Sequence, residues 1–174
     1  MSLHRPRKNG KIQLERTGPF VPPMSLPGAV DAVVTDSFRL EMEKSGLTGI
    51  EFQTVIKKRI VKLNWREWDL AKPEPPTYPD NGEPEEYILG KLHSPIVSWK
   101  MGKLWEVLFD VGAKVERIEH ETVLDEIFLK TNSWNGKDFF RADDVGFVYC
   151  TEKAKDWLRN RVAPFVDFEE AETR

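Results

Sequence analysis

Proline placement is the feature that most constrains the fold of this chain of 174 residues. Ten of its twelve prolines fall in two short segments, five before residue 28 and five between residues 73 and 84. Because proline lacks the backbone N–H that helices and central strands use, we expect both segments to be irregular. The sequence therefore predicts an extended N-terminal arm at 1–27 and a single folded domain at 28–170.

The second proline-rich segment is acidic. Residues 69–86 contain six acidic side chains and one lysine, whereas residues 5–11 carry four basic side chains. The formal net charge of −3 is thus an average over local charge runs of opposite sign. We interpret 69–86 as an acidic extended loop, which is either a solvated connector or a surface offered to a basic partner.

Apolar spacing predicts a succession of strands and helices. A short apolar run at 29–34 is typical of a strand, and the pair Thr35-Asp36 after it is typical of a helix start, with Gly46 as the stop. Alternation predicts strands over 50–63, and Thr151 opens another helix. Further strands are expected at 115–119, 125–130, 146–150 and 165–168.

Two segments allow more than one interpretation. Residues 99–111 fit both the helical and the strand period, and the complete i, i+3, i+4, i+7 series from Met101 to Leu108 favours a helix. Asn135-Gly136 is the pair that best tolerates a two-residue hairpin turn, so we expect a hairpin there.

These elements define an α+β single domain, with a mixed, mostly antiparallel sheet and two or three helices packed on it. An offset of 116 residues places Thr35 on Thr151 and Phe52 on Phe168. This alignment indicates an internal strand–helix–strand repeat, or else the general similarity of any two capped units of this kind.

Composition limits the function classes. Hydrophobic residues make up 40% of the chain, which is enough for a packed core. The charge balance gives no excess positive field, so we expect no nucleic-acid partner. With one cysteine, Cys150, no apolar run of membrane-spanning length and no apolar signal region, we expect a cytoplasmic protein without a membrane partner.

Few residues have a spacing that carries chemistry. The three histidines show no metal-ligand spacing and no phosphate-binding glycine motif occurs, so we expect neither a metal nor a cofactor. Cys150 ends an apolar strand, where an inert buried thiol is usual. Acidic clusters occur at Asp125-Glu126, Asp138 and Asp143-Asp144, and their turn-like context suits the capping of backbone donors better than catalysis. Asp125, Glu126 and Asp138 leave a small hydrolase or nuclease-like enzyme as the alternative function.

A family resemblance rests on two stretches. The sequence V-V-T-D-S-F-R-L-E-M-E-K-S-G-L-T-G-I-E-F, and W-N-G-K-D-F-F-R followed by V-Y-C-T-E-K-A-K-D-W-L, resemble the polymorphic-toxin immunity proteins of the myxobacterial type, which are related to the double-CxxCG motif proteins. The matching parts cover residues 28–64 and 125–170. This chain departs from that branch in having no CxxC motif, on which a zinc-ribbon role depends.

The resemblance implies a non-enzymatic α+β protein that binds and neutralises a cognate bacterial protein toxin. Aromatic anchors inside a polar rim are typical of such interfaces, and acidic residues would steer a basic toxin. The partner-binding candidates are Trp65, Trp68, Glu83, Glu85 and Glu86.

Overall fold

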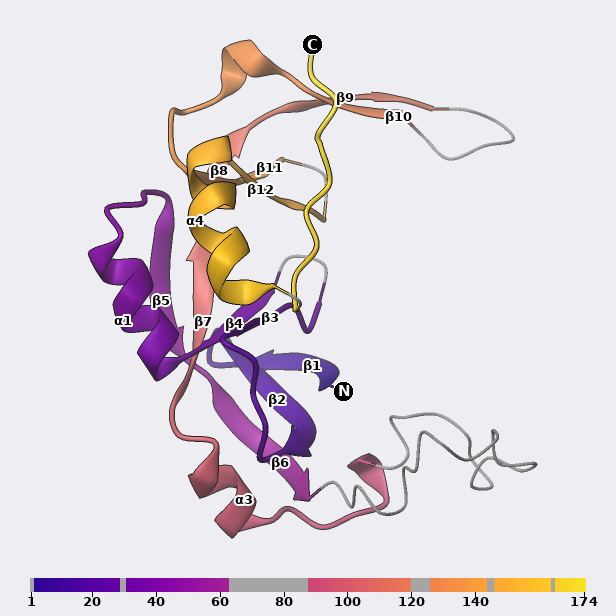
Figure 1. The fold of residues 1–174 in the computed structure, drawn as a ribbon. Coiled ribbons are helices and arrows are strands. Elements are labelled where there is room, and N and C mark those ends of the chain that lie inside the picture. The colour runs from indigo at the N-terminus through magenta and orange to yellow at the C-terminus, as the bar shows by residue number, and fades with distance from the viewer. Residues whose placement is uncertain (1, 29–30, 63–87, 120–125, 144–145, 164) are drawn as a thin grey trace, which may run out of the picture. The chain divides into compact units, whose positions relative to one another are not determined.

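The computed structural model describes residues 2–28, 31–62, 88–119, 126–143, 146–163 and 165–174 (Figure 1). The fold is α+β with mostly antiparallel sheets, as predicted. The chain divides into two compact units. Unit 1 comprises Met1–Val21 and Thr54–Leu104, and unit 2 comprises Pro22–Gln53 and Trp105–Arg174.

Unit 1 is built on a three-stranded sheet in the order β1-β2-β6. Strands β1 (Ser2–Lys8) and β2 (Lys11–Gly18) form an antiparallel hairpin, and β6 (Ile56–Lys62) pairs with β2 in parallel. Residues 2–18 therefore belong to a sheet, which differs from the extended arm predicted at 1–27. Pro6 is tolerated because β1 is an edge strand, where one row of N–H groups has no partner strand.

Helix α3 (Pro95–Lys100) packs on this sheet. The buried side chains of Val97 in the helix and of Met101, its C-cap, lie over Gly18, where an added Cβ would be 2.8 Å from the Met101 sulfur. The residues before the helix also bond to β6. The Ile60 N–H donates to His93 Nδ1 at 2.9 Å, and the Ser94 N–H donates to the Ile60 carbonyl at 2.8 Å.

The helix predicted over 99–111 is wrong. Helix α3 ends at Lys100, Gly102 follows with φ of 69°, and Leu104–Phe109 forms strand β7. The four-stranded sheet of unit 2 has the order β3-β4-β7-β5, so β7 lies inside it. Pairing on both edges decides the structure of a segment whose apolar spacing fits either period.

Two helices that each begin at a threonine follow short strands in unit 2. Strand β4 (Ala32–Thr35) leads into α1 (Asp36–Lys44), and β12 (Val148–Cys150) leads into α4 (Glu152–Val162). Their inner faces and the strands form one core, made of Met24, Ala32, Val34, Phe38, Met42, Val107, Phe109, Phe139, Ala154, Leu158 and Val162.

The remaining strands of unit 2 complete the four-stranded sheet and form two smaller sheets. Strands β3 (Met24–Ser25) and β5 (Ile50–Thr54) complete the four-stranded sheet. Strands β8 (Val111–Ala113), β11 (Phe139–Ala142) and β12 form another, in the order β12-β11-β8. Strands β9 (Val115–Ile118) and β10 (Glu126–Leu129) pair antiparallel, and the 3-10 helix η1 (Thr131–Ser133) follows.

The hairpin predicted at Asn135-Gly136 is wrong. This pair lies between η1 and β11, and β11 pairs with β12 and β8. Gly136 does have the positive φ, 80°, that the pair suggests. The chain before it forms a 3-10 turn, so no strand precedes the turn to complete a hairpin.

The internal repeat is present only in part. Strand, threonine cap and helix occur in both copies, but the returning strand β5 of the first copy has no counterpart, because residues 165–168 form no strand. The chain end instead lies beside β10. The Leu129 N–H donates to the Glu172 carbonyl at 2.8 Å, and the Arg174 N–H donates to the Leu129 carbonyl at 3.0 Å.

Candidate functional site

The predicted partner-binding residues are not placed by the structure. Trp65, Trp68, Glu83, Glu85 and Glu86, together with the acidic loop at 69–86, lie outside the described residues. Asp125, a member of the predicted acidic cluster, also lies outside them.

The other two acidic residues of the predicted cluster, Glu126 and Asp138, lie on different segments of unit 2. Glu126 is exposed at the start of β10, whereas Asp138 is buried just before β11. The Asp138 carboxylate accepts hydrogen bonds from the Thr48 N–H at 2.9 Å and from the Thr48 hydroxyl at 3.0 Å. It also accepts from Thr151 Oγ1 at 3.2 Å and Lys153 Nζ at 3.1 Å.

These contacts determine the protonation of Asp138. Burial by itself raises the pKa of the carboxyl group, but the hydrogen bonds from Thr48, Lys153 and Thr151 together outweigh it and hold the pKa below its ordinary value. The carboxylate is therefore ionised at neutral pH. The Asp138 carboxylate oxygens accept hydrogen bonds from groups of the protein itself, so the side chain links segments of the fold.

The single thiol is partly shielded from solvent. Cys150 is half-buried at the end of β12, and burial raises its pKa to about 11. A thiol with such a pKa stays protonated near neutral pH, and the protonated form is a poor nucleophile and metal ligand. Among the described residues, no group of three or more His, Cys, Asp and Glu side chains is placed to hold a metal ion.

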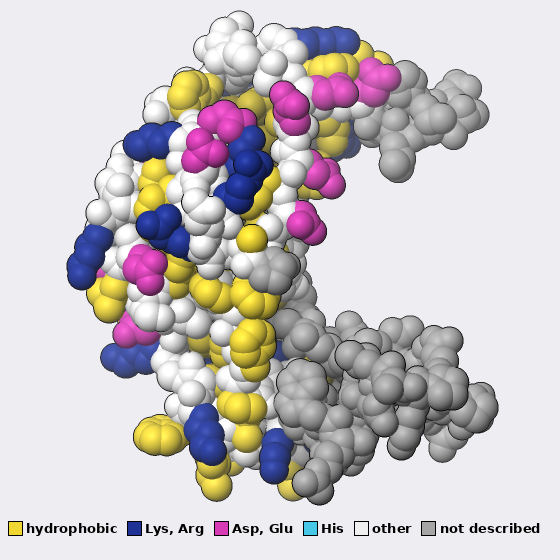
Figure 2. Space-filling model, in the orientation of Figure 1, with side chains coloured by type: hydrophobic (Ala, Val, Ile, Leu, Met, Phe, Trp, Pro, Cys, Tyr) yellow, Lys and Arg dark blue, Asp and Glu magenta, His cyan; other side chains and the backbone are white. Residues whose placement is uncertain are grey.

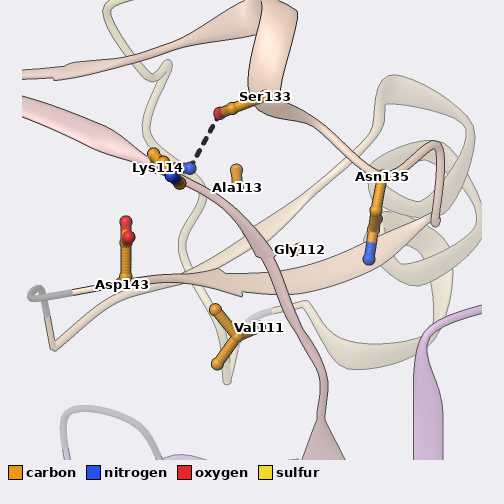
Figure 3. Close-up of a pocket in the computed structure, with 7 residues that line it drawn as sticks. All are labelled: Val111, Gly112, Ala113, Lys114, Ser133, Asn135 and Asp143. Carbon is orange, nitrogen blue, oxygen red and sulfur yellow. Dashed lines mark hydrogen bonds between the residues drawn. The ribbon is translucent and has the colours of Figure 1, made fainter.

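An open pocket of about 200 Å³ lies in unit 2 (Figure 3). The Ser133 hydroxyl accepts from the Lys114 N–H at 2.8 Å and donates to the Lys130 carbonyl at 2.7 Å, so its proton is engaged. Asn135 and Asp143 lie at opposite ends of the pocket. The Asn135 side chain also bonds to the backbone, accepting from the Lys137 N–H at 3.1 Å, and it does not converge with Asp143 on one point. The pocket is lined by Val111, Gly112, Ala113, Lys114, Ser133, Asn135 and Asp143.

Unit 1 presents a group of large apolar side chains to solvent. Leu92 is 93% exposed, Ile96 is 70% exposed and Trp99 is 80% exposed. They lie on α3 and just before it, and we call them the α3 ridge. In Figure 2 hydrophobic side chains stand out over α3 at the lower edge of the view. Exposed apolar groups gathered in this way mark interaction surfaces.

The spacing of the α3 ridge could not reveal its exposure. Leu92, Ile96 and Trp99 are four and three residues apart, which is the spacing expected of a buried helical face. Val97 and Met101, also four apart, have that spacing too and are the buried pair. Only the packing of α3 on Gly18 decides which of the two faces meets the sheet.

The described part of unit 1 is strongly basic. Residues 2–21 hold five Lys and Arg side chains, and residues 54–62 and 88–104 hold seven more, against a single acid, Glu15. Glu15 is only 1% exposed and lies 3.5 Å from Lys58 Nζ. The described residues of unit 2, in contrast, hold twelve Lys and Arg against eighteen Asp and Glu. The net charge of −3 thus conceals a separation of charge between the two units.

Comparison of the chain with protein-family models, with curated proteins and with solved structures gives no significant match. No helix in the described part of the chain is long and apolar enough to cross a membrane.

Proposed function

We propose that this chain is a non-enzymatic, immunity-type protein that binds and neutralises a cognate bacterial protein toxin in the cytoplasm. The observation that carries the proposal is the α3 ridge, where Leu92, Ile96 and Trp99 stand in solvent. Tryptophan is enriched among the side chains that dominate binding energy, and apolar neighbours exclude water around it. The resemblance of residues 28–64 and 125–170 to immunity proteins supplies the class of partner.

Neutralisation would occur by occlusion. A stable protein–protein interface buries about 1,200–2,000 Å² in total, which is far more than three side chains provide. The α3 ridge would therefore form the apolar centre of a larger contact, surrounded by polar side chains. An interface of this size over a toxin's active site or substrate channel blocks it without any chemical step.

The alternative, a small hydrolase or nuclease-like enzyme built on Asp125, Glu126 and Asp138, has less support. Asp138 already accepts hydrogen bonds from Thr48, Thr151 and Lys153. A catalytic carboxylate needs a lone pair directed at substrate, water or metal.

The proposal is tested with the product of the adjacent reading frame. That product is expressed in a host with and without this chain, and growth is followed together with co-purification of the two proteins. We expect growth arrest without this chain, and rescue with it. The variant L92S/I96S/W99S should lose rescue, whereas F147S, which changes an exposed apolar residue of unit 2, should keep it. A neighbour that is harmless and does not co-purify would contradict the proposal.

A further inference from the structure

We infer that the α3 ridge docks onto an acidic protein surface that contains an apolar pocket, so that the toxin's contact face is acidic. This inference rests on the proposed function and adds the chemistry of the partner. It reverses the charge assignment expected from the acidic loop at 69–86, which would steer a basic toxin.

Charge around the α3 ridge carries the inference. Lys100 and Lys103 are exposed beside it, and Lys91 lies just before it and is half-buried. No acidic side chain is exposed among the described residues of unit 1, because its one acid, Glu15, is buried. A surface of this sign attracts an acidic partner and repels a basic one.

The side-chain types favour a protein over a nucleic acid. Two of the three ridge side chains, Leu92 and Ile96, are aliphatic and fit an apolar pocket, so Trp99 is the one ring of the α3 ridge on which a base could stack. Several cations of unit 1 are also engaged inside it. Lys57 donates to the carbonyls of Ser98 and Gly102, and Arg16 donates to those of Thr17 and Phe20. These groups are bound to the backbone, so they contribute charge but are poorly placed to track a phosphate chain.

The α3 ridge is held in position before any partner arrives. The Ser94 side chain caps α3 by accepting from the Val97 N–H at 3.4 Å. Lys57 ties down the other end of the helix, 2.8 Å from the Gly102 carbonyl. Because Val97 and Met101 are buried beneath, the helix cannot roll without exposing them. A surface ordered in this way loses less conformational entropy on binding.

The experiment measures binding of the full chain to the purified product of the adjacent reading frame, at several salt concentrations between 50 and 300 mM. These concentrations bracket the range over which surface charges are screened, with a Debye length of about 8 Å at physiological ionic strength. We expect K100E/K103E to slow association at least about tenfold at low salt and to flatten its salt dependence. I96S/W99S should speed dissociation at least about tenfold and leave the salt dependence unchanged.

Two further variants serve as controls for the charge changes. K44E/K114E alters the charge by the same amount in unit 2 and should change association less than about twofold. E83K/E85K/E86K tests the opposite assignment and should not slow association. Thermal melts establish that each variant is folded, and K103E alone, beyond the end of α3, replaces the double variant if Lys100 proves structural.

Each outcome decides between the proposals. If neither K100E/K103E nor I96S/W99S changes the binding rates, or if K100E/K103E speeds association, the acidic-partner inference is wrong. The proposed function is not affected by either result. If wild type does not bind the neighbour's product at all, the proposed function fails, and the inference fails with it. If a single-stranded oligonucleotide binds the wild-type chain but not I96S/W99S, the partner of the α3 ridge is a nucleic acid and the inference of a protein partner is wrong.

Discussion

Asp138 and Thr48, which are 90 residues apart, are joined by three hydrogen bonds in both directions. The Thr48 N–H and hydroxyl donate to the Asp138 carboxylate, and the Asp138 N–H donates back to Thr48 Oγ1 at 3.0 Å. The Phe139 N–H adds a bond to the Thr48 carbonyl at 3.0 Å. Thr151, the N-cap of α4, joins the same carboxylate, so one side chain connects the start of β11 with α4 and with the segment just before β5.

Substitution of Asp138 should destabilise unit 2 in a pH-dependent way. Because the folded-state pKa of this carboxyl group is lowered, its contribution is fully present above the unfolded pKa of about 3.9 and is lost as the pH falls through the folded value. Asp138→Ala should cost about 1.5–3 kcal/mol at pH 7 and less at pH 3. Urea titrations at both pH values measure the difference.

Lys153 provides the control for this prediction. Its side chain is 65% exposed, although its ammonium lies 3.1 Å from Asp138. Exposed ion pairs contribute at most about 1 kcal/mol, so Lys153→Ala should cost much less than Asp138→Ala. Equal losses for the two variants would show that the ion pair, and not the Thr48 bonds, carries the stability.

The two N-cap threonines should differ in importance. Thr35 accepts from the Phe38 N–H and Thr151 from the Ala154 N–H, both at 3.3 Å, so the caps are equivalent. Thr35→Ala should cost about 1 kcal/mol. Thr151→Ala should cost more, because its hydroxyl also donates to Asp138. Thermal unfolding compares the two, and serine at either position should restore most of the loss. A smaller loss at 151 than at 35 would contradict the bridging role.

Gly49 should tolerate no side chain. Its φ is 89°, and an added Cβ would lie 2.0 Å from the Phe139 carbonyl oxygen. The left-handed conformation alone costs a non-glycine residue about 1–2 kcal/mol, and the backbone contact requires β11 to move as well. Gly49→Ala should therefore lower the denaturation midpoint far more than Gly46→Ala, because Gly46 also has positive φ but open space around it. Equal effects would mean that the contact is relieved at little cost.

Cys150 should react slowly with alkylating reagents in the folded protein. Burial raises its pKa to about 11, so only about one thiol in a thousand is ionised at pH 8. Iodoacetamide labelling, followed by mass spectrometry, should be at least about tenfold slower than that of glutathione and should accelerate with rising pH. Labelling in denaturant should run to completion. A folded protein that labels as fast as glutathione would show that the thiol is accessible and ionised.

Local chemistry explains which elements could be predicted. Thr35-Asp36 and Thr151-Glu152 start helices because a hydroxyl accepts an N–H of the first turn and an acid stabilises the same end. The strands expected around 115–119 and 146–150 also form. These signals need only neighbouring residues, so they hold whatever the rest of the chain does.

Other elements depend on partners far away in the sequence. Residues 104–109 form a strand because they pair with β4 on one side and with β5 on the other. Residues 2–8 form a strand because they pair with β2. For the candidate site, the sequence supplied Asp138 as a capping residue but gave no reason to choose Leu92, Ile96 and Trp99. Their apolar spacing is that of a core, and it is the burial of Val97 and Met101 that leaves them in solvent.

The sequence by itself determined the α+β class, the two threonine caps and the near-neutral charge, because these follow from composition and from contacts within a few residues. Only the tertiary structure decided that eighteen of the nineteen acids among the described residues lie in unit 2, that Thr48 meets Asp138, and that the α3 ridge faces outward. Each of these depends on which distant segments pack together. Long-range packing depends on how the whole chain buries its apolar surface, and no short segment contains that information.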